Sequence, residues 1–208
     1  DFLLGVPQTT SRNYVRPPRY ARFYHLSGFF QDDYKVSQSF TLSYGIRWDY
    51  NQPARDKHDI IFNVDAANGR LVVPNQTIID QYVNPLFPKT IPIVTAAAAG
   101  FPERSLRNRD LNNFQPRIGF AWRPFGGTKN VIRGGYGMFN DDFTADIFSV
   151  LYGGPFALTE SFVNTIANNT PALTLQRPFL GAGTTGNVDV TGIAMNVRNA
   201  YAQQWNLT

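Results

Sequence analysis

Apolar and polar residues alternate without an error from Phe40 to Tyr50, and few structures can accommodate this pattern. The even-numbered positions are aromatic or aliphatic, whereas the odd-numbered positions are polar, charged or glycine. Successive side chains of a β-strand point to opposite sides, so a period of two predicts a strand with one apolar and one polar face. Helical spacing would place Ser43 beside Ile46 and would mix the two kinds of residue.

Six segments are predicted to form strands, most of them from the same alternation. They lie near residues 8–15, 24–34, 40–50, 114–123, 131–139 and 201–208. A soluble strand typically has about 5–6 residues, whereas a strand of eleven residues extends over roughly 36 Å. Tilted by about 45°, such a strand rises about 25 Å, which is the height of the apolar band of an outer-membrane barrel.

The connections between these strands are alternately short and long. Segments 35–39 and 124–130 are turn-sized, whereas loops 51–113 and 140–200 far exceed the roughly 15 residues above which unstructured loops become uncommon. Antiparallel strands with short turns at one end and long extracellular loops at the other are typical of bacterial outer-membrane barrels. We therefore predict an all-β antiparallel meander that forms part of a transmembrane outer-membrane β-barrel.

The long loops contain signals for short elements of their own. Segments 60–65 and 70–73 flank Asn68-Gly69, a dipeptide that strongly favours a hairpin turn. Short helices are predicted over 143–151 and over 93–99. The extracellular loops are therefore expected to hold short helices and a small hairpin.

The composition excludes several kinds of site. The chain has no cysteine, so a disulfide scaffold, a cysteine-ligated zinc and a thiol nucleophile are ruled out. The two histidines, His25 and His58, lie far apart, and no nucleophile motif or phosphate-binding glycine loop appears. The net charge of +4 is scattered, and a single Arg133-Gly134-Gly135 run is weak evidence for RNA binding. We predict no metal, no cofactor, no enzyme activity and no nucleic-acid partner.

The ends of the chain suggest a fragment of a longer protein. The chain opens at Asp1 without a signal peptide and stops at Thr208 inside a strand-like run, and no stretch approaches 18 uninterrupted apolar residues. Five or six strands are too few to close a barrel, because the smallest barrels have about eight. Since a bilayer does not tolerate an open sheet edge, other strands of the same protein are expected to complete the wall.

The alternation assigns candidate residues to each face of the predicted wall. The candidates for lining the lumen are Arg47, Asp49, Arg117, Arg123 and Arg133. The candidates for the lipid-facing side and its aromatic girdles are Tyr34, Tyr44, Trp48, Tyr50, Trp122 and Tyr136. Two interpretations of the charged set remain open. It could form an electrostatic lining for anionic or polar substrates, or ion pairs and hydrogen bonds that hold the wall and an internal plug in place.

Several runs of residues resemble a known family. FQDDYKV at 30–36 followed by LSYGIRWDY at 42–50 resembles a signature of TonB-dependent outer-membrane receptors. NFQPRIGFAWRPF at 113–125 with VIRGGYGMF at 131–139 is similar to a run of the Oar-like subgroup. DFLLG at the start and QQWNLT at the end look like two further landmarks of that subgroup, in the same order.

This resemblance implies a barrel of roughly 22 strands with an N-terminal plug domain that lies outside these 208 residues. It implies active uptake of an unidentified ligand, such as a carbohydrate or a peptide, across the bacterial outer membrane. The implied partners are outer-membrane lipid, the plug domain and remaining strands of the same protein, and the TonB complex. Two alternatives remain open at this stage: a soluble β-sandwich or adhesin-like binding module, and a passive porin or secretion channel.

Overall fold

The computed structural model describes residues 2–14, 17–127, 129–151, 153–179, 184–185 and 190–208. The chain forms two compact units, and each is assembled from three separate segments. The long-strand unit comprises residues 22–54, 107–147 and 194–208, and the loop unit comprises residues 1–21, 55–106 and 148–193. Among the described residues, no helix combines the length and the apolar character needed to cross a membrane.

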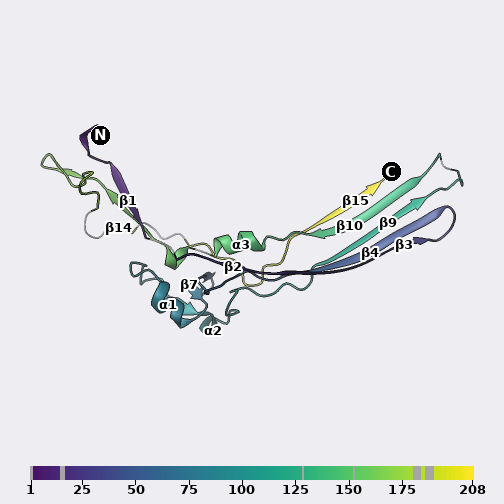
Figure 1. The fold of residues 1–208 in the computed structure, drawn as a ribbon, viewed down its shortest axis with the longest axis horizontal. Helices are drawn as coiled ribbons and strands as arrows, with labels where there is room; N and C mark the ends of the chain where they lie inside the picture. Colours follow the sequence, from purple (N-terminus) through teal and green to yellow (C-terminus); the bar gives the residue numbers. More distant parts are fainter. Residues whose placement is uncertain (1, 15–16, 128, 152, 180–183, 186–189) are drawn as a thin grey trace. The chain divides into compact units, whose positions relative to one another are not determined.

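The long-strand unit contains one antiparallel sheet, whose five strands lie side by side in Figure 1. The strands are β3 (His25–Lys35), β4 (Phe40–Asn51), β9 (Phe114–Trp122), β10 (Ile132–Asn140) and β15 (Tyr201–Leu207). Their order is β15-β10-β9-β4-β3, so each long strand pairs with the next long strand along the sequence. The predicted all-β fold with an antiparallel meander is therefore confirmed.

The register of the sheet keeps the two kinds of residue on separate faces. Tyr44 of β4 lies opposite Ile118 of β9, Ile118 lies opposite Tyr136 of β10, and Tyr136 lies opposite Trp205 of β15. Directly opposed residues share a face, so this row crosses one side of the sheet. We call that side the apolar face and the reverse side, which carries Arg47, the polar face. A shift by one residue would exchange the two sides of a strand, so the alternation determines the register.

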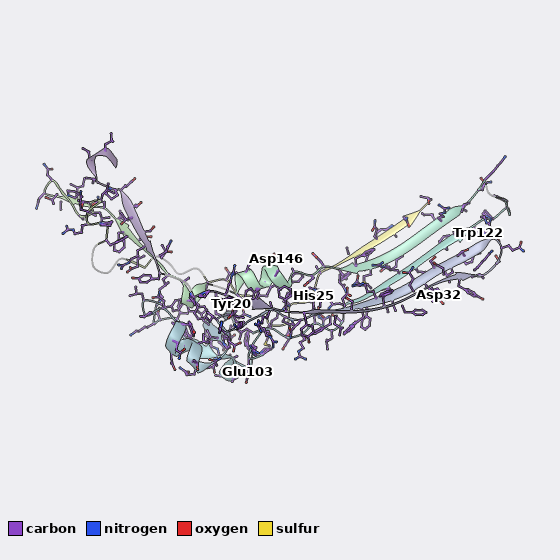
Figure 2. All side chains as sticks on the ribbon, in the orientation of Figure 1. Tyr20, His25, Asp32, Glu103, Trp122 and Asp146 are labelled. Atoms are coloured by element: carbon purple, nitrogen blue, oxygen red, sulfur yellow. The ribbon has the colours of Figure 1, made fainter. Side chains whose placement is uncertain are left out.

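The two short connections form turns at the same end of the sheet. In the β3–β4 turn, Ser37 N–H donates to the carbonyl of Phe40 at 3.1 Å. In the β9–β10 turn, Gly126 adopts a φ of 70°, which glycine tolerates without strain, and its N–H donates to the carbonyl of Arg123. Arg123 N–H also donates to the carbonyl of Ser39 at 2.8 Å and thereby links the two turns. Trp122 lies at this turn end of the sheet, and His25 lies at the opposite, loop end (Figure 2).

The loop unit consists of short elements around a small core. Its strands are β1 (Thr9–Asn13), β5 (Arg55–Asp56), β6 (Asn63–Asp65), β7 (Arg70–Val73), β8 (Ile93–Thr95), β11 (Thr159–Val163), β12 (Ile166–Ala167), β13 (Thr170–Pro171) and β14 (Thr184–Thr185). Its helices are η1 (Phe2–Leu4), α1 (Gln76–Tyr82), α2 (Ala96–Ala99) and η2 (Gly154–Phe156). Some boundaries between the two units fall inside a short element. The boundary at residues 21 and 22 lies in strand β2 (Ala21–Arg22), and the boundary at residues 147 and 148 lies in helix α3 (Thr144–Val150).

The core of the loop unit brings together residues from both long loops. The buried members are Ile60, Phe62, Leu71, Val73, Ile78, Phe87, Phe156 and Leu158. The ring of Phe62, which is 1% exposed, meets the ring of Phe156 edge-on with centroids 6.3 Å apart. The two long loops therefore fold together around a shared apolar core.

The predicted hairpin forms, and one predicted helix differs from the structure. Strand β6 pairs antiparallel with β7, and Gly69 in their turn has a φ of 60°. The segment 93–99 is not one helix as predicted, because its first three residues form β8, which runs parallel to β7. The β-branched side chains of that strand favour extended backbone, and Thr95 then caps α2 by accepting a hydrogen bond from Ala98 N–H.

The strand predicted near residues 8–15 forms as β1 but does not join the wall of long strands. It pairs antiparallel with β11, so Thr10 lies opposite Phe162 and Arg12 lies opposite Glu160. Interpreting it as a barrel strand is therefore wrong. With only five residues, β1 is too short for the roughly 9–11 residues of a membrane-spanning strand.

A buried polar cluster accompanies the β1–β11 pairing. The Glu160 carboxylate, whose residue is 1% exposed, accepts hydrogen bonds from the Arg12 guanidinium and from the Tyr14 hydroxyl at 2.6 Å. The hydrogen bond to Glu160 raises the pKa of Tyr14 above its ordinary value. A buried carboxylate needs such partners, because an unpaired buried charge is strongly unfavourable.

The β6–β7 hairpin is predicted to loosen in acid. Oδ2 of Asp65 accepts hydrogen bonds from Asn68 Nδ2 and Arg70 Nε, both at 2.8 Å, and these bonds hold the pKa of Asp65 below its ordinary value. A lowered folded-state pKa stabilises the hairpin at neutral pH, and this contribution disappears as the pH falls through that pKa. Hydrogen-exchange protection of the β6–β7 amides, corrected for intrinsic rates, should therefore fall as the pH drops below about 4, the ordinary pKa of an aspartate. An equal fall in Asp65→Asn would contradict this assignment.

Candidate functional site

A hydrogen-bonded network crosses three strands on the polar face. Arg47 Nε donates to Asp49 Oδ1 at 2.8 Å, and Arg47 also donates to the hydroxyl of Ser27 on β3 at 2.9 Å. On the other side, the amide of Gln115 on β9 donates to the carboxylate of Asp49. The alternation brings these residues together because Ser27 lies opposite Asp49 and Arg47 lies opposite Gln115. For this pair of candidates, the geometry favours bonds that hold the strands together.

Arg117 lies among small residues in the middle of the polar face. Its register partners are Gly45 on β4 and Gly137 on β10, and its guanidinium lies 4.9 Å from the ring centroid of Phe139. A hollow of about 250 Å³ is lined by Arg117 together with Ser43 and other residues of the neighbouring strands. Arg117 forms none of the ion pairs found in the described ranges, so its charge is available to a molecule that approaches this face.

A second row of small residues runs beside Arg117. Ser43 lies opposite Gly119, and Gly119 lies opposite Gly135, so three adjacent strands contribute almost no side-chain volume at this level. Glycine within a strand commonly marks a place where another backbone or a ligand comes close. The polar face thus places the positively charged guanidinium of Arg117 beside a surface that carries only small side chains.

The other two lumen candidates lie nearer the turn end. The Arg123 guanidinium donates to the carbonyl of Gln38 in the neighbouring turn, so it ties the two turns together. Arg133 lies opposite Ala121, is exposed, and forms no ion pair within the described part of the chain. An electrostatic role therefore remains a prediction for Arg117 and Arg133, whereas Arg123 has a structural partner.

The aromatic candidates occupy three levels of the apolar face. Tyr34 and Trp122 lie close to the turn end of their strands, and Trp48 lies close to the loop end. Tyr44 and Tyr136 share the row in the middle of the sheet. The hydroxyl of Tyr44 donates to Asp32 Oδ2 at 3.1 Å, and this bond gives a partner to a carboxylate that lies on the apolar face, opposite Tyr44.

Tyr50 does not match its predicted place on an exposed face. The residue is only 7% exposed, because its ring lies against Tyr24 and Trp48, with centroid separations of 5.9 Å and 6.4 Å. The prediction that Tyr50 faces lipid is therefore wrong. Alternation places a side chain on one side of a strand, but it does not reveal which neighbours cover that side chain.

Much of the rest of the apolar face is exposed, and several other residues on it are half-buried. Ile118 on the central strand β9 is 52% exposed, and Trp205 on the edge strand β15 is 75% exposed, although both are large apolar residues. A soluble β-sandwich would bury such a row between its two sheets. Contiguous exposed apolar surface of this kind marks a membrane or protein contact.

Sequence reasoning missed two members of the polar network, Ser27 and Gln115. Both have the same strand parity as the charged candidates, so the alternation could have identified them. The Arg12–Glu160 pair gave no comparable signal, because its members lie 148 residues apart in the sequence. In the ranges that the structure describes, no three acidic or histidine side chains gather in a way that could hold a metal ion.

The comparison with known families agrees with this geometry. The family model described as the outer membrane beta barrel domain matches residues 1–208, which is the whole chain. No curated protein and no solved structure matches the chain. Membrane barrels alternate apolar, outward-facing residues with polar, inward-facing ones on long strands, as this sheet does. The chain belongs to the outer membrane beta barrel domain family, and its long strands form part of a barrel wall in the bacterial outer membrane.

Proposed function

We propose that this chain supplies wall strands and extracellular loops to an Oar-like, TonB-dependent transporter that takes up a ligand actively. The motif at 30–50 resembles TonB-dependent receptors and the motif at 113–139 resembles the Oar-like subgroup, and the two coincide with the paired strands β3–β4 and β9–β10. In this proposal the apolar face contacts lipid and the polar face lines the lumen. The chain itself carries out no enzymatic step and holds no cofactor, and its partners do not include nucleic acid.

The small-residue row on the polar face is the observation that carries the proposal. A plug domain that fills the lumen must bring its own backbone and side chains close to the wall. Ser43, Gly119 and Gly135 leave room for that approach, and Arg117 beside them offers a donor to carbonyl or carboxylate groups of a plug.

The edges of the five-stranded sheet also require partners. Strands β3 and β15 each pair on one side only within the described residues. Unpaired backbone N–H and C=O groups in hydrocarbon cost several kcal/mol each, so an open edge does not persist there. We propose that other strands of the same protein pair with β3 and β15 and close the barrel.

Thiol labelling of the full-length protein in intact cells tests whether a plug occupies the lumen. These 208 residues contain no cysteine, so Ser43→Cys adds one small reporter to the polar face, and any cysteine elsewhere in the full-length protein is first replaced by serine. We expect a membrane-impermeant maleimide to label this cysteine slowly, and at least tenfold faster after deletion of the plug domain. Thr77→Cys, in an exposed position of α1, is the control that should label rapidly in both forms. Rapid labelling of both cysteines with the plug in place would favour a passive porin or a secretion channel.

Dependence on TonB is tested separately. The full-length protein in detergent should be captured by the immobilised periplasmic domain of TonB, and this capture should be lost when the N-terminal region that precedes the barrel is removed. Failure of the intact protein to bind TonB would overturn the TonB-dependent part of the proposal. It would leave the assignment to a barrel wall intact.

A further inference from the structure

A polar cavity lies at the loop end of the long-strand unit. Two segments form it: residues 108–114, which lead into β9, and residues 196–198, which lead towards β15. Its volume is about 500 Å³, within the range of small-molecule and headgroup sites. None of the roles proposed above uses this cavity.

The two segments are fastened to each other without any bound molecule. The N–H of Asn108 donates to the carbonyl of Met195 at 2.8 Å, and its side-chain amide donates to Asn196 Oδ1 at 2.6 Å. Further along, Asn199 N–H donates to Asp110 Oδ2 at 2.9 Å. Because these bonds join both walls, a ligand would enter a largely preformed site and would not need to order it.

The cavity presents unneutralised positive charge. Arg109 and Arg198 both line it, both are exposed, and neither takes part in the ion pairs of the described ranges. The single acid of the lining, Asp110, directs its two oxygens at the backbone N–H groups of Asn112 and Asn199. Two free guanidinium groups are suited to phosphate or carboxylate, which they bind through paired hydrogen bonds.

The apolar residues that line the cavity show that it adjoins the apolar face of the sheet. Phe114 lies opposite Trp48 in the register, so it belongs to the apolar face. The indole N–H of Trp48 donates to the carbonyl of Leu111, another lining residue, at 2.8 Å. Phe114 and Leu111 are 50% and 57% exposed. The cavity is thus continuous with the apolar face and lies at the loop end of β9.

We propose that this cavity binds the acidic sugar headgroup of an outer-leaflet glycolipid. Arg109 and Arg198 bind its phosphate or carboxylate groups, the side-chain amides of Asn112 and Asn196 bond its hydroxyls, and Phe114 and Leu111 contact its apolar part. A free acidic sugar shares the charged groups but lacks the acyl chains, so the apolar floor favours the lipid. This inference rests on the family assignment and not on TonB-driven uptake, since binding requires no energy source.

Equilibrium binding to the full-length protein in neutral detergent tests the proposal. The probes are purified lipopolysaccharide, glucose 6-phosphate and glucose, and binding is followed by surface plasmon resonance. We expect saturable binding of lipopolysaccharide, and at least tenfold weaker binding to the double variant Arg109→Gln/Arg198→Gln. Arg198→Lys should lie between the two, because it retains the charge but loses the paired hydrogen bonds. Heat-modifiable migration on gels verifies that each variant is folded.

Arg177→Gln is the matched control, because it removes the charge of another exposed arginine that does not line the cavity. It should bind lipopolysaccharide like the unaltered protein, and an equal loss in this control would show a general charge effect and overturn the proposal. Tight binding of glucose 6-phosphate without binding of lipopolysaccharide would identify a soluble ligand and exclude the glycolipid. Binding of neither probe would overturn the site altogether.

Discussion

Ile46→Arg in the full-length protein should reduce assembly into the outer membrane at least tenfold. Ile46 lies near the middle of β4 on the apolar face, where it is 46% exposed and is opposed by Phe30 and Pro116. An arginine on the lipid side of a barrel costs about 2–4 kcal/mol at the bilayer midplane. Each 1.4 kcal/mol changes an equilibrium tenfold, so the folded and inserted form should be strongly depleted. Tyr44→Arg, one row away on the same face, should behave in the same way.

Ser43→Arg is the matched control for these two substitutions. Ser43 is the immediate neighbour of Tyr44, but it lies on the polar face opposite Gly119, on the side of the sheet that does not contact lipid. Assembly should stay close to that of the unaltered protein. The measurement is the amount of heat-modifiable barrel in isolated outer membranes, quantified on gels. Equal assembly of all three variants would mean that the two faces are wrongly assigned.

Phe62→Ala should destabilise the loop unit by about 3–5 kcal/mol. The Phe62 side chain is 1% exposed and contacts Phe156 in the centre of the core. Its removal leaves a cavity that so small a unit cannot easily fill, because its core has few members. Limited proteolysis of intact cells should therefore cleave the loop unit far faster in the variant. The barrel itself should still assemble, because the long-strand unit has its own sheet and its own contacts.

Phe125→Ala is the control for the loss of an aromatic side chain. Phe125 lies in the β9–β10 turn and is 81% exposed, so its removal creates no cavity. Proteolysis of the loop unit should be unchanged in this variant. If Phe62→Ala and Phe125→Ala were cleaved at the same rate, the core described here would not stabilise the extracellular loops.

Much of the long-strand sheet could be predicted from the sequence. The strict alternation of β4 identifies the strand, its two faces and its length, because each backbone step reverses the side chain. The short turns then determine that β3 pairs with β4 and that β9 pairs with β10, since only antiparallel neighbours can be joined so closely. The meander and the position of Arg47 and Asp49 on one face follow from these local rules.

The loop unit could be predicted only in pieces. The β6–β7 hairpin has an Asn-Gly turn, which predicts it. Helix α1 has Asn75 as its N-cap, whose side chain accepts from Ile78 N–H, but a single capping residue before so short an apolar segment is a weaker signal. The pairing of β1 with β11 has no local signal, because it joins residues about 150 positions apart. Nothing in either segment by itself indicates that the Glu160 carboxylate will be buried beside Arg12.

The sequence alone therefore determined the period of the strands, the chemistry of each face and the places where the chain turns. These properties depend on residues that are adjacent in the sequence, because each backbone step reverses the side chain and each turn involves only a few consecutive residues. The tertiary structure decided which side chains are covered, as with Tyr50, and which distant segments meet, as with the two walls of the cavity around Arg109 and Arg198. Coverage and long-range contact depend on where the whole chain places its parts, and no single segment encodes that placement.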